Sequence, residues 1–111
     1  MTHDELSKLN DEIKAAEHIY IEALGKKLMA EIERKNSLEA AKNMAASCDI
    51  NGKSPSEAAC DRLARQDSRY LTAGVAEVEA IVEFETARKV VDFCKRKFEL
   101  SLAVFNSLNK G

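Results

Sequence analysis

Residues 54–108 contain one proline, Pro55, near their start and one glycine, Gly74, and apolar residues recur through them at helical spacing almost to the end. Proline and glycine are the residues that most strongly interrupt a helix. A stretch of about 55 residues with so few of them therefore favours one long helix. We predict this helix over 55–108, with the first half of the chain as its packing partner.

The beginning of the predicted helix carries a specific start signal. The Ser54 side chain can accept a hydrogen bond from the amide of Glu57, the Glu57 carboxylate can reach back, and Pro55 suits the first helical position. The alternative is a break near Asp67-Ser68, where Ser68 caps a new helix and the chain folds into three helices.

Two apolar rows run along this helix on different parts of its circumference. The first is a heptad seam with large residues in one line and mostly small ones in the other: Phe84, Val91, Phe98 and Phe105, followed at three residues by Ala87, Cys94, Ser101 and Leu108. The second row, interrupted by Thr86 and Lys97, consists of Val75, Val78, Val82, Phe93, Leu100 and Val104. One partner helix cannot cover both rows, so the sequence predicts a larger, intermolecular bundle.

The first half of the chain predicts a second amphipathic helix, over 3–48. Thr2 and Glu5 form a possible capping box, and apolar residues then recur every three or four positions: Leu6, Leu9, Ile13, Ala16, Tyr20, Leu24, Leu28 and Ile32. A turn at 49–54 follows, in which Asn51-Gly52 can supply a positive φ. A short turn between two long helices indicates an all-α fold, an antiparallel helical hairpin that forms a single domain over 1–111.

The charges support this hairpin. A turn near residue 51 or 52 pairs positions whose numbers add to roughly 103. Residues 1–24 carry six acids and two lysines, a net charge of −4, whereas residues 86–97 carry five bases and one acid, a net charge of +4. The same register sets Tyr20 near Phe84 and Met29 opposite Gly74. The alanine-rich stretches 40–46 and 58–64 also face each other, which predicts close helix packing.

The two arms of the predicted hairpin differ in length, about 45 residues against about 54, so the last two turns of the second helix overhang. An exposed apolar tip of this kind predicts self-association. We expect the contacts between copies to be made by Phe98, Leu102, Phe105 and Leu108. We expect a homodimer with a four-helix arrangement.

Composition narrows the class of protein. At 111 residues, 32% charged and 45% hydrophobic, with a net charge of −2, the chain is typical of a small helical protein with no general affinity for nucleic acid. There is no run of 18 apolar residues and no signal-peptide pattern at the N-terminus, so we expect a cytoplasmic protein that does not bind membranes. Three cysteines without metal-ligand spacing, Cys48, Cys60 and Cys94, are expected to be reduced and packed on helix faces.

Candidate chemical sites are few. His18 and Glu22 lie one helical turn apart, but the sequence offers no further metal ligand nearby. No catalytic residue, metal site or cofactor site is predicted, so the chain is expected not to be an enzyme. A row of arginines with an adjacent tyrosine forms a possible face for a protein partner or for the phosphates of nucleic acid: Arg62, Arg65, Arg69 and Tyr70.

The second half of the chain resembles small coiled-coil proteins of bacteriophages and prophages. The resemblance is carried by Asp67-Ser68-Arg69-Tyr70-Leu71, by Ala76-Glu77-Val78-Glu79-Ala80 and by the segment 98–108. It implies a small non-enzymatic accessory protein or inhibitor that binds a host or phage protein. We therefore expect a protein–protein interaction module, with a nucleic-acid-associated accessory protein that uses the arginine face as the alternative.

Overall fold

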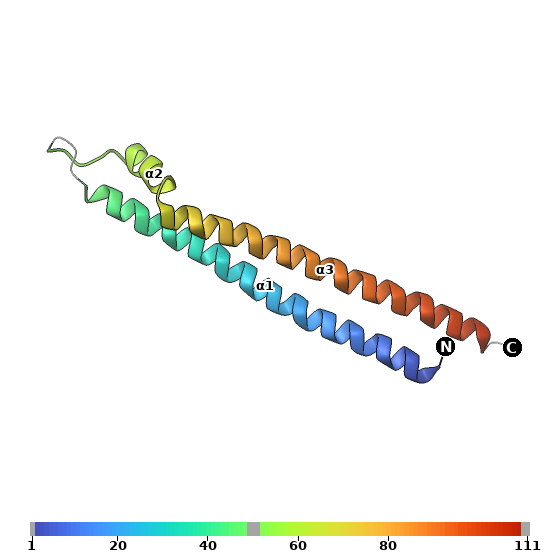
Figure 1. The fold of residues 1–111 in the computed structure, drawn as a ribbon. Helices are drawn as coiled ribbons and strands as arrows, with labels where there is room; N and C mark the ends of the chain where they lie inside the picture. Colours follow the sequence, from blue (N-terminus) through green and yellow to red (C-terminus); the bar gives the residue numbers. More distant parts are fainter. Residues whose placement is uncertain (1, 49–51, 110–111) are drawn as a thin grey trace. The chain divides into compact units, whose positions relative to one another are not determined.

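A computed structural model describes residues 2–48 and 52–109, which form three helices and no strand (Figure 1). Helix α1 spans His3–Ala46, α2 spans Glu57–Arg65 and α3 spans Ser68–Leu108. The predicted all-α fold and helical hairpin are confirmed.

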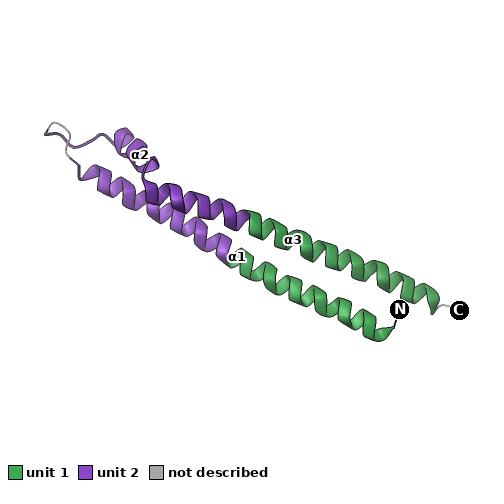
Figure 2. Cartoon of the chain, viewed as in Figure 1, with its two compact units in different colours: residues 1–25, 82–111 green, residues 26–81 purple. Residues whose placement is uncertain are grey.

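The chain divides into two compact units (Figure 2). Unit 1 comprises residues 1–25 and 82–111, and unit 2 comprises residues 26–81. In unit 1 the rings of His3 and Phe105 and those of Tyr20 and Phe84 are in contact, so the numbers fall along α3 as they rise along α1. This is the antiparallel pairing that the hairpin requires.

Unit 2 shows the same antiparallel direction. Arg34 contacts Glu77, and further along α1 Met44 contacts Arg69. The predicted register holds at Tyr20 and Phe84, but the numbers of Arg34 and Glu77 add to 111 rather than 103. Met29 is mostly exposed, and a Cβ at Gly74 would meet no atom within 4 Å, so the expected pairing of Met29 with Gly74 is wrong.

The predicted continuous helix over 55–108 is also wrong, because α2 ends at Arg65 and α3 begins at Ser68. The Asp67 carboxylate accepts a hydrogen bond from the amide of Arg69 at 2.9 Å. Aspartate side chains compete in this way with a continuing helix, which explains the break. The three-helix alternative is confirmed, with Asp67 rather than Ser68 as the residue whose side chain bonds the first turn of α3.

Of the two predicted helix caps, the one at Ser54 is wrong and the one at Thr2 is confirmed. Ser56, not Ser54, caps α2, since its hydroxyl accepts a hydrogen bond from the amide of Ala59 at 3.2 Å. At the start of α1, the predicted capping box is present, with the Thr2 and Glu5 side chains each accepting from the other residue's amide at 3.2 Å. Residues 49–51 of the predicted turn lie outside the described residues.

The two long helices are nearly equal, 44 residues in α1 and 41 in α3. Residues 47–67 separate them and include α2. The second arm is shorter than predicted because it begins at Ser68 instead of at residue 55. The centroids of the His3 and Phe105 rings lie 5.0 Å apart, so α1 covers α3 as far as Phe105. The expected overhang of the last two turns is therefore wrong.

The predicted heptad seam is the face of α3 that is buried. Phe84, Ala87 and Val91 are buried, Cys94, Phe98, Ser101 and Phe105 are half-buried, and only Leu108 is exposed. Phe84 and Ala87 form the core of unit 1 with Ala23, which is 2% exposed, and Tyr20 packs beside them. A large residue thus meets a small one across the two helices, which allows close packing.

In unit 2 the buried side chains are small: Ala41, Ala45, Cys60, Ala64 and Ala80. Four of them come from the alanine-rich stretches predicted to pack closely, and the ion pair between Lys42 and Asp61 brings α2 alongside the end of α1. Cys60 is buried and Cys94 half-buried, as expected for packed thiols, whereas Cys48 is exposed and that prediction is wrong.

Substitution of two glycines by alanine should have opposite effects on stability. Gly52 has a φ of +77°, which a residue with a Cβ adopts at a cost of about 1–2 kcal/mol. Gly25 lies inside α1, and a Cβ there would meet no atom within 4 Å. We expect Gly52→Ala to destabilise the chain by about 1 kcal/mol and Gly25→Ala to stabilise it by about 1 kcal/mol, measured by urea unfolding. Equal effects of the same sign would contradict this.

Candidate interaction surfaces

Unit 1 carries an apolar row on the side of α3 that faces away from the seam. Four residues make up this outward row, and all are largely exposed: Val82 at 60%, Phe93 at 67%, Leu100 at 71% and Val104 at 53%. Nine residues, or two and a half helical turns, separate Phe84 from Phe93, so these two side chains point in opposite directions. The prediction that one partner helix cannot cover both rows is confirmed for this unit.

The spacing of the outward row suits a nearly straight helix. Val82, Phe93 and Val104 follow one another at intervals of eleven residues. An eleven-residue repeat corresponds to 3.67 residues per turn, close to the 3.6 of an undistorted helix. The row therefore keeps to one side of α3, where a second straight helix can follow it.

Unit 2 has an apolar groove on its own part of α3. Its walls are formed by Tyr70, Leu71, Val75 and Val78, and Gly74 lies between them. Because Gly74 has no side chain and nothing lies within 4 Å of its Cβ position, the groove is open to solvent there.

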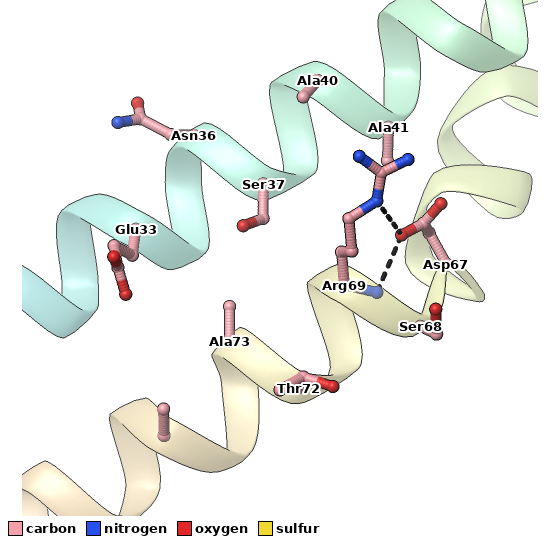
Figure 3. Close-up of a pocket in the computed structure, with 11 residues that line it drawn as sticks. Glu33, Asn36, Ser37, Ala40, Ala41, Asp67, Ser68, Arg69, Thr72 and Ala73 are labelled. Atoms are coloured by element: carbon pink, nitrogen blue, oxygen red, sulfur yellow. Dashed lines mark hydrogen bonds and ion pairs between the residues drawn. The ribbon is translucent and has the colours of Figure 1, made fainter.

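A second groove in unit 2, of about 650 Å³, lies between α1 and the first turns of α3 (Figure 3). Its lining combines small and polar residues, among them Ser37, Ala40, Asp67 and Thr72. Figure 3 shows the Arg69 guanidinium beside Asp67. The Asp67 carboxylate accepts a hydrogen bond from the backbone amide of Arg69 and lies 3.9 Å from the Nε of the same residue. The hydrogen bond to the Arg69 amide caps the start of α3.

The predicted arginine face is divided between two helices. Arg62 and Arg65 lie on α2, and Arg69 lies on α3. The Nε of Arg65 binds the Asp61 carboxylate at 3.0 Å, and Arg69 contacts Asp67 and the Met44 sulfur. A phosphate would have to compete with these aspartates for two of the three arginines.

Tyr70, predicted to belong to the face for a protein partner or nucleic acid, is half-buried and lies beside Arg34. The Arg34 guanidinium binds the Glu77 carboxylate at 2.6 Å, and this pair joins α1 to α3 in unit 2. The hydrogen bond that Arg34 donates to Glu77, followed by the hydrogen bond between Arg34 and Tyr70, raises the pKa of Arg34. This pair was not predicted, because the register expected from the turn does not bring Arg34 and Glu77 together.

The predicted self-association residues do not form one exposed tip. Phe98 and Phe105 belong to the half-buried seam, and Phe105 contacts His3. Leu102 and Leu108 are exposed, at 36% and 70%. The outward row, which belongs to the second apolar row of the sequence, is exposed at each of its four residues.

The Asp61 carboxylate on α2 forms ion pairs with two cations, one of which lies on α1. Its carboxylate binds Arg65 within α2 and, at 3.4 Å, the Nζ of Lys42 on α1. The hydrogen bond from Arg65 is the main reason that the pKa of Asp61 lies below its ordinary value, and Lys42 adds to it. A carboxylate with a depressed pKa stabilises the fold at neutral pH and loses that contribution as the pH falls through its folded pKa.

Asp61→Asn should therefore change stability in a pH-dependent way. We expect it to lower the thermal midpoint at pH 7, and the difference from the native chain should shrink below the ordinary aspartate pKa of about 3.9. Circular dichroism melts at several pH values measure this. Asp11→Asn, at an exposed site in unit 1, is the control. A difference that stays constant down to pH 3 would contradict the assignment.

The described residues contain no group of three histidine, cysteine or carboxylate side chains arranged to bind a metal. His18 and Glu22 form an exposed pair at 3.0 Å.

None of the helices, over the residues described, offers an apolar stretch of the length that crossing a bilayer requires. No family model, curated protein or solved structure matches this chain.

Proposed function

We propose that this chain is a non-enzymatic protein–protein interaction module whose outward row on α3 binds an amphipathic helix of a partner. The observation that carries the proposal is the exposure of Val82, Phe93, Leu100 and Val104, each more than half accessible on a helix whose other side is already packed. Apolar rows of this extent are typical of binding surfaces rather than of solvated helix faces.

The geometry of the row favours a helix as the bound element. From Val82 to Val104 the row extends over about 33 Å, and its eleven-residue spacing keeps it straight. Charged residues flank it, among them Glu85, Arg96 and Lys97, as in helix pairs whose edges select the partner. The described residues contain no strand, so addition of a partner strand to a sheet edge has no counterpart in them.

The proposal includes the class suggested by the resemblance, a phage-type accessory protein or inhibitor acting on a host or phage protein in the cytoplasm. Three free cysteines are compatible with a reducing compartment. This class stays a prediction, which identification of the bound protein would test.

Affinity capture with three versions of the chain tests the function. Tagged native chain, Phe93→Glu and Ile21→Glu would be incubated with nuclease-treated lysate of the source cells, and retained proteins would be identified by mass spectrometry. Ile21 is a matched control, because it is a similarly exposed apolar residue, 64% accessible, on α1.

We expect one protein in near-stoichiometric amount with the native chain and with Ile21→Glu, and its loss with Phe93→Glu. Retention that is equal for all three versions would overturn the assignment of the outward row. A parallel capture from untreated lysate tests the nucleic-acid alternative. Material that is retained there and lost after nuclease treatment would replace the proposal with that alternative.

A further inference from the structure

We infer that the outward row of α3 binds α3 of a second copy of this chain, in antiparallel orientation, about a two-fold axis that passes between positions 87 and 88. The inference rests on the proposed function, since it names one partner for the same row. Two independent features of α3 point to it, the spacing of the apolar residues and the distribution of charge.

The apolar spacing of the row is symmetric about this point. In the inferred pairing, facing positions have numbers that add to 175, so Val82 lies opposite Phe93 of the second copy, and Phe93 opposite its Val82. Every contact is thus made twice, which is the property of an isologous two-fold interface. The spacing along α3 continues the match, with Leu100 opposite Val75 and Val104 opposite Leu71, all more than half exposed.

The same register also places two polar residues, Thr86 and Lys89, close to the axis. Thr86 and Lys89 lie opposite each other across the axis. In a parallel pairing Lys89 would instead face Lys89 of the second copy, which is unfavourable for two like charges on facing helices. In the antiparallel pairing its ammonium group faces position 86 of the second copy, one residue from Glu85, whose carboxylate also binds Arg88 of its own chain at 2.6 Å.

Charge changes sign along α3 close to the same point. Four acids occupy residues 77–85, namely Glu77, Glu79, Glu83 and Glu85, and five bases occupy residues 88–97, namely Arg88, Lys89, Lys95, Arg96 and Lys97. An antiparallel pairing centred between 87 and 88 sets the acidic segment of each copy beside the basic segment of the other. A parallel pairing would set acids beside acids and bases beside bases, which disfavours it.

Some of these charges also make contacts within the chain. Glu77 binds Arg34, Lys95 binds Glu17 and Lys97 binds Glu12. Lys89 and Arg96 lie on the outward side, at the edge of the row, and both are exposed. The charges thus select the orientation of the pair, while burial of the apolar row supplies most of its stability.

Light scattering at micromolar concentration, with the full chain, tests the association. We expect twice the chain mass of 12.3 kDa for the native protein and for Ile21→Glu, and the single mass for Phe93→Glu. Because Phe93 is largely exposed, Phe93→Glu should keep the helical circular dichroism signal at a concentration where it is monomeric. A native chain that is monomeric up to millimolar concentration would overturn the inference.

Cross-linking with a short bismaleimide tests the orientation. Two Thr86→Cys side chains would lie about 4.5 Å apart along the helix axis, and two Val104→Cys side chains about 50 Å apart. We expect covalent dimer from Thr86→Cys well above the native baseline, which the three native cysteines set, and none above it from Val104→Cys. Strong cross-linking of Val104→Cys indicates a parallel pair and would overturn the register.

The two proposals fail in different ways. A monomeric native chain that still loses its captured protein on Phe93→Glu keeps the interaction function and removes the second copy as the partner. A dimer with the expected cross-links that retains the same proteins regardless of Phe93 supports the inference and assigns the outward row to self-association alone.

Discussion

Replacing Phe84 with alanine should lower the free energy of unfolding by about 3 kcal/mol, the lower end of the range for a buried phenylalanine. Phe84 is the largest buried side chain of unit 1, where it packs against Ala23 and Ala87, and its ring centroid lies 5.1 Å from that of Tyr20. The buried residues beside the ring, Ala23 and Ala87, are too short to fill the space that it leaves. The effect should therefore include a cavity contribution as well as lost burial.

Urea unfolding followed by circular dichroism measures the total loss for Phe84→Ala, and hydrogen exchange resolved by peptide locates it. We expect faster exchange at the amides of residues 3–25 and 82–108 and a smaller change in unit 2. Ile21→Ala, which removes an exposed side chain next to Tyr20, should change stability by about 0.5 kcal/mol or less. If both variants lose the same stability, Phe84 is not the core residue that we describe.

The buried face of α3 could be predicted from the sequence because a seven-residue period is maintained there for three heptads. Phe84, Val91, Phe98 and Phe105 are the residues that the period selects, and each is buried or half-buried. The second row was equally visible as a pattern. Periodicity alone cannot say which row the chain covers with its own helix and which it leaves exposed, since both rows are apolar.

The boundary between α2 and α3 could not be placed with the same certainty, because single side-chain hydrogen bonds decide it. Asp67 can continue a helix or bond the amide of Arg69, and Ser54 and Ser56 both precede an acceptable helix start. Moving the end of the hairpin from a short turn to a segment that includes α2 shifts the register of the arms. That shift explains why Arg34, rather than a residue nearer the predicted register, binds Glu77.

The predicted overhanging tip is wrong for a related reason. An overhang was expected from two arms of unequal length, and the extra length of the second arm is taken up before α3 begins. Phe98 and Phe105 consequently lie in the seam, and the exposed outward row lies on the opposite side of the helix. The sequence could predict that α3 exposes apolar residues. Which of them are exposed depended on where α2 ends and α3 begins.

Replacing Ala64 with aspartate should detach α2 while leaving most of the helical structure in place. Ala64 is 1% exposed, and a carboxylate at that position would have to be taken out of water, which costs several kcal/mol or more unless the charge is paired. Because α2 has only 9 residues, the chain can relieve the cost by opening this helix locally. The helical circular dichroism signal should therefore fall only slightly.

The buried thiol of Cys60 reports the opening, since it lies on the same helix, one turn before Ala64. A docking free energy lowered by about 2 kcal/mol makes the open form about thirty times more populated, so thiol labelling of Cys60 should accelerate by a similar factor. Exposed Cys48 provides an internal reference within each sample. Ala58→Asp, the same substitution at an exposed position of α2, should leave the rate unchanged within about a factor of two. If Ala64→Asp labels Cys60 no faster than Ala58→Asp does, α2 is not held in place by its buried face.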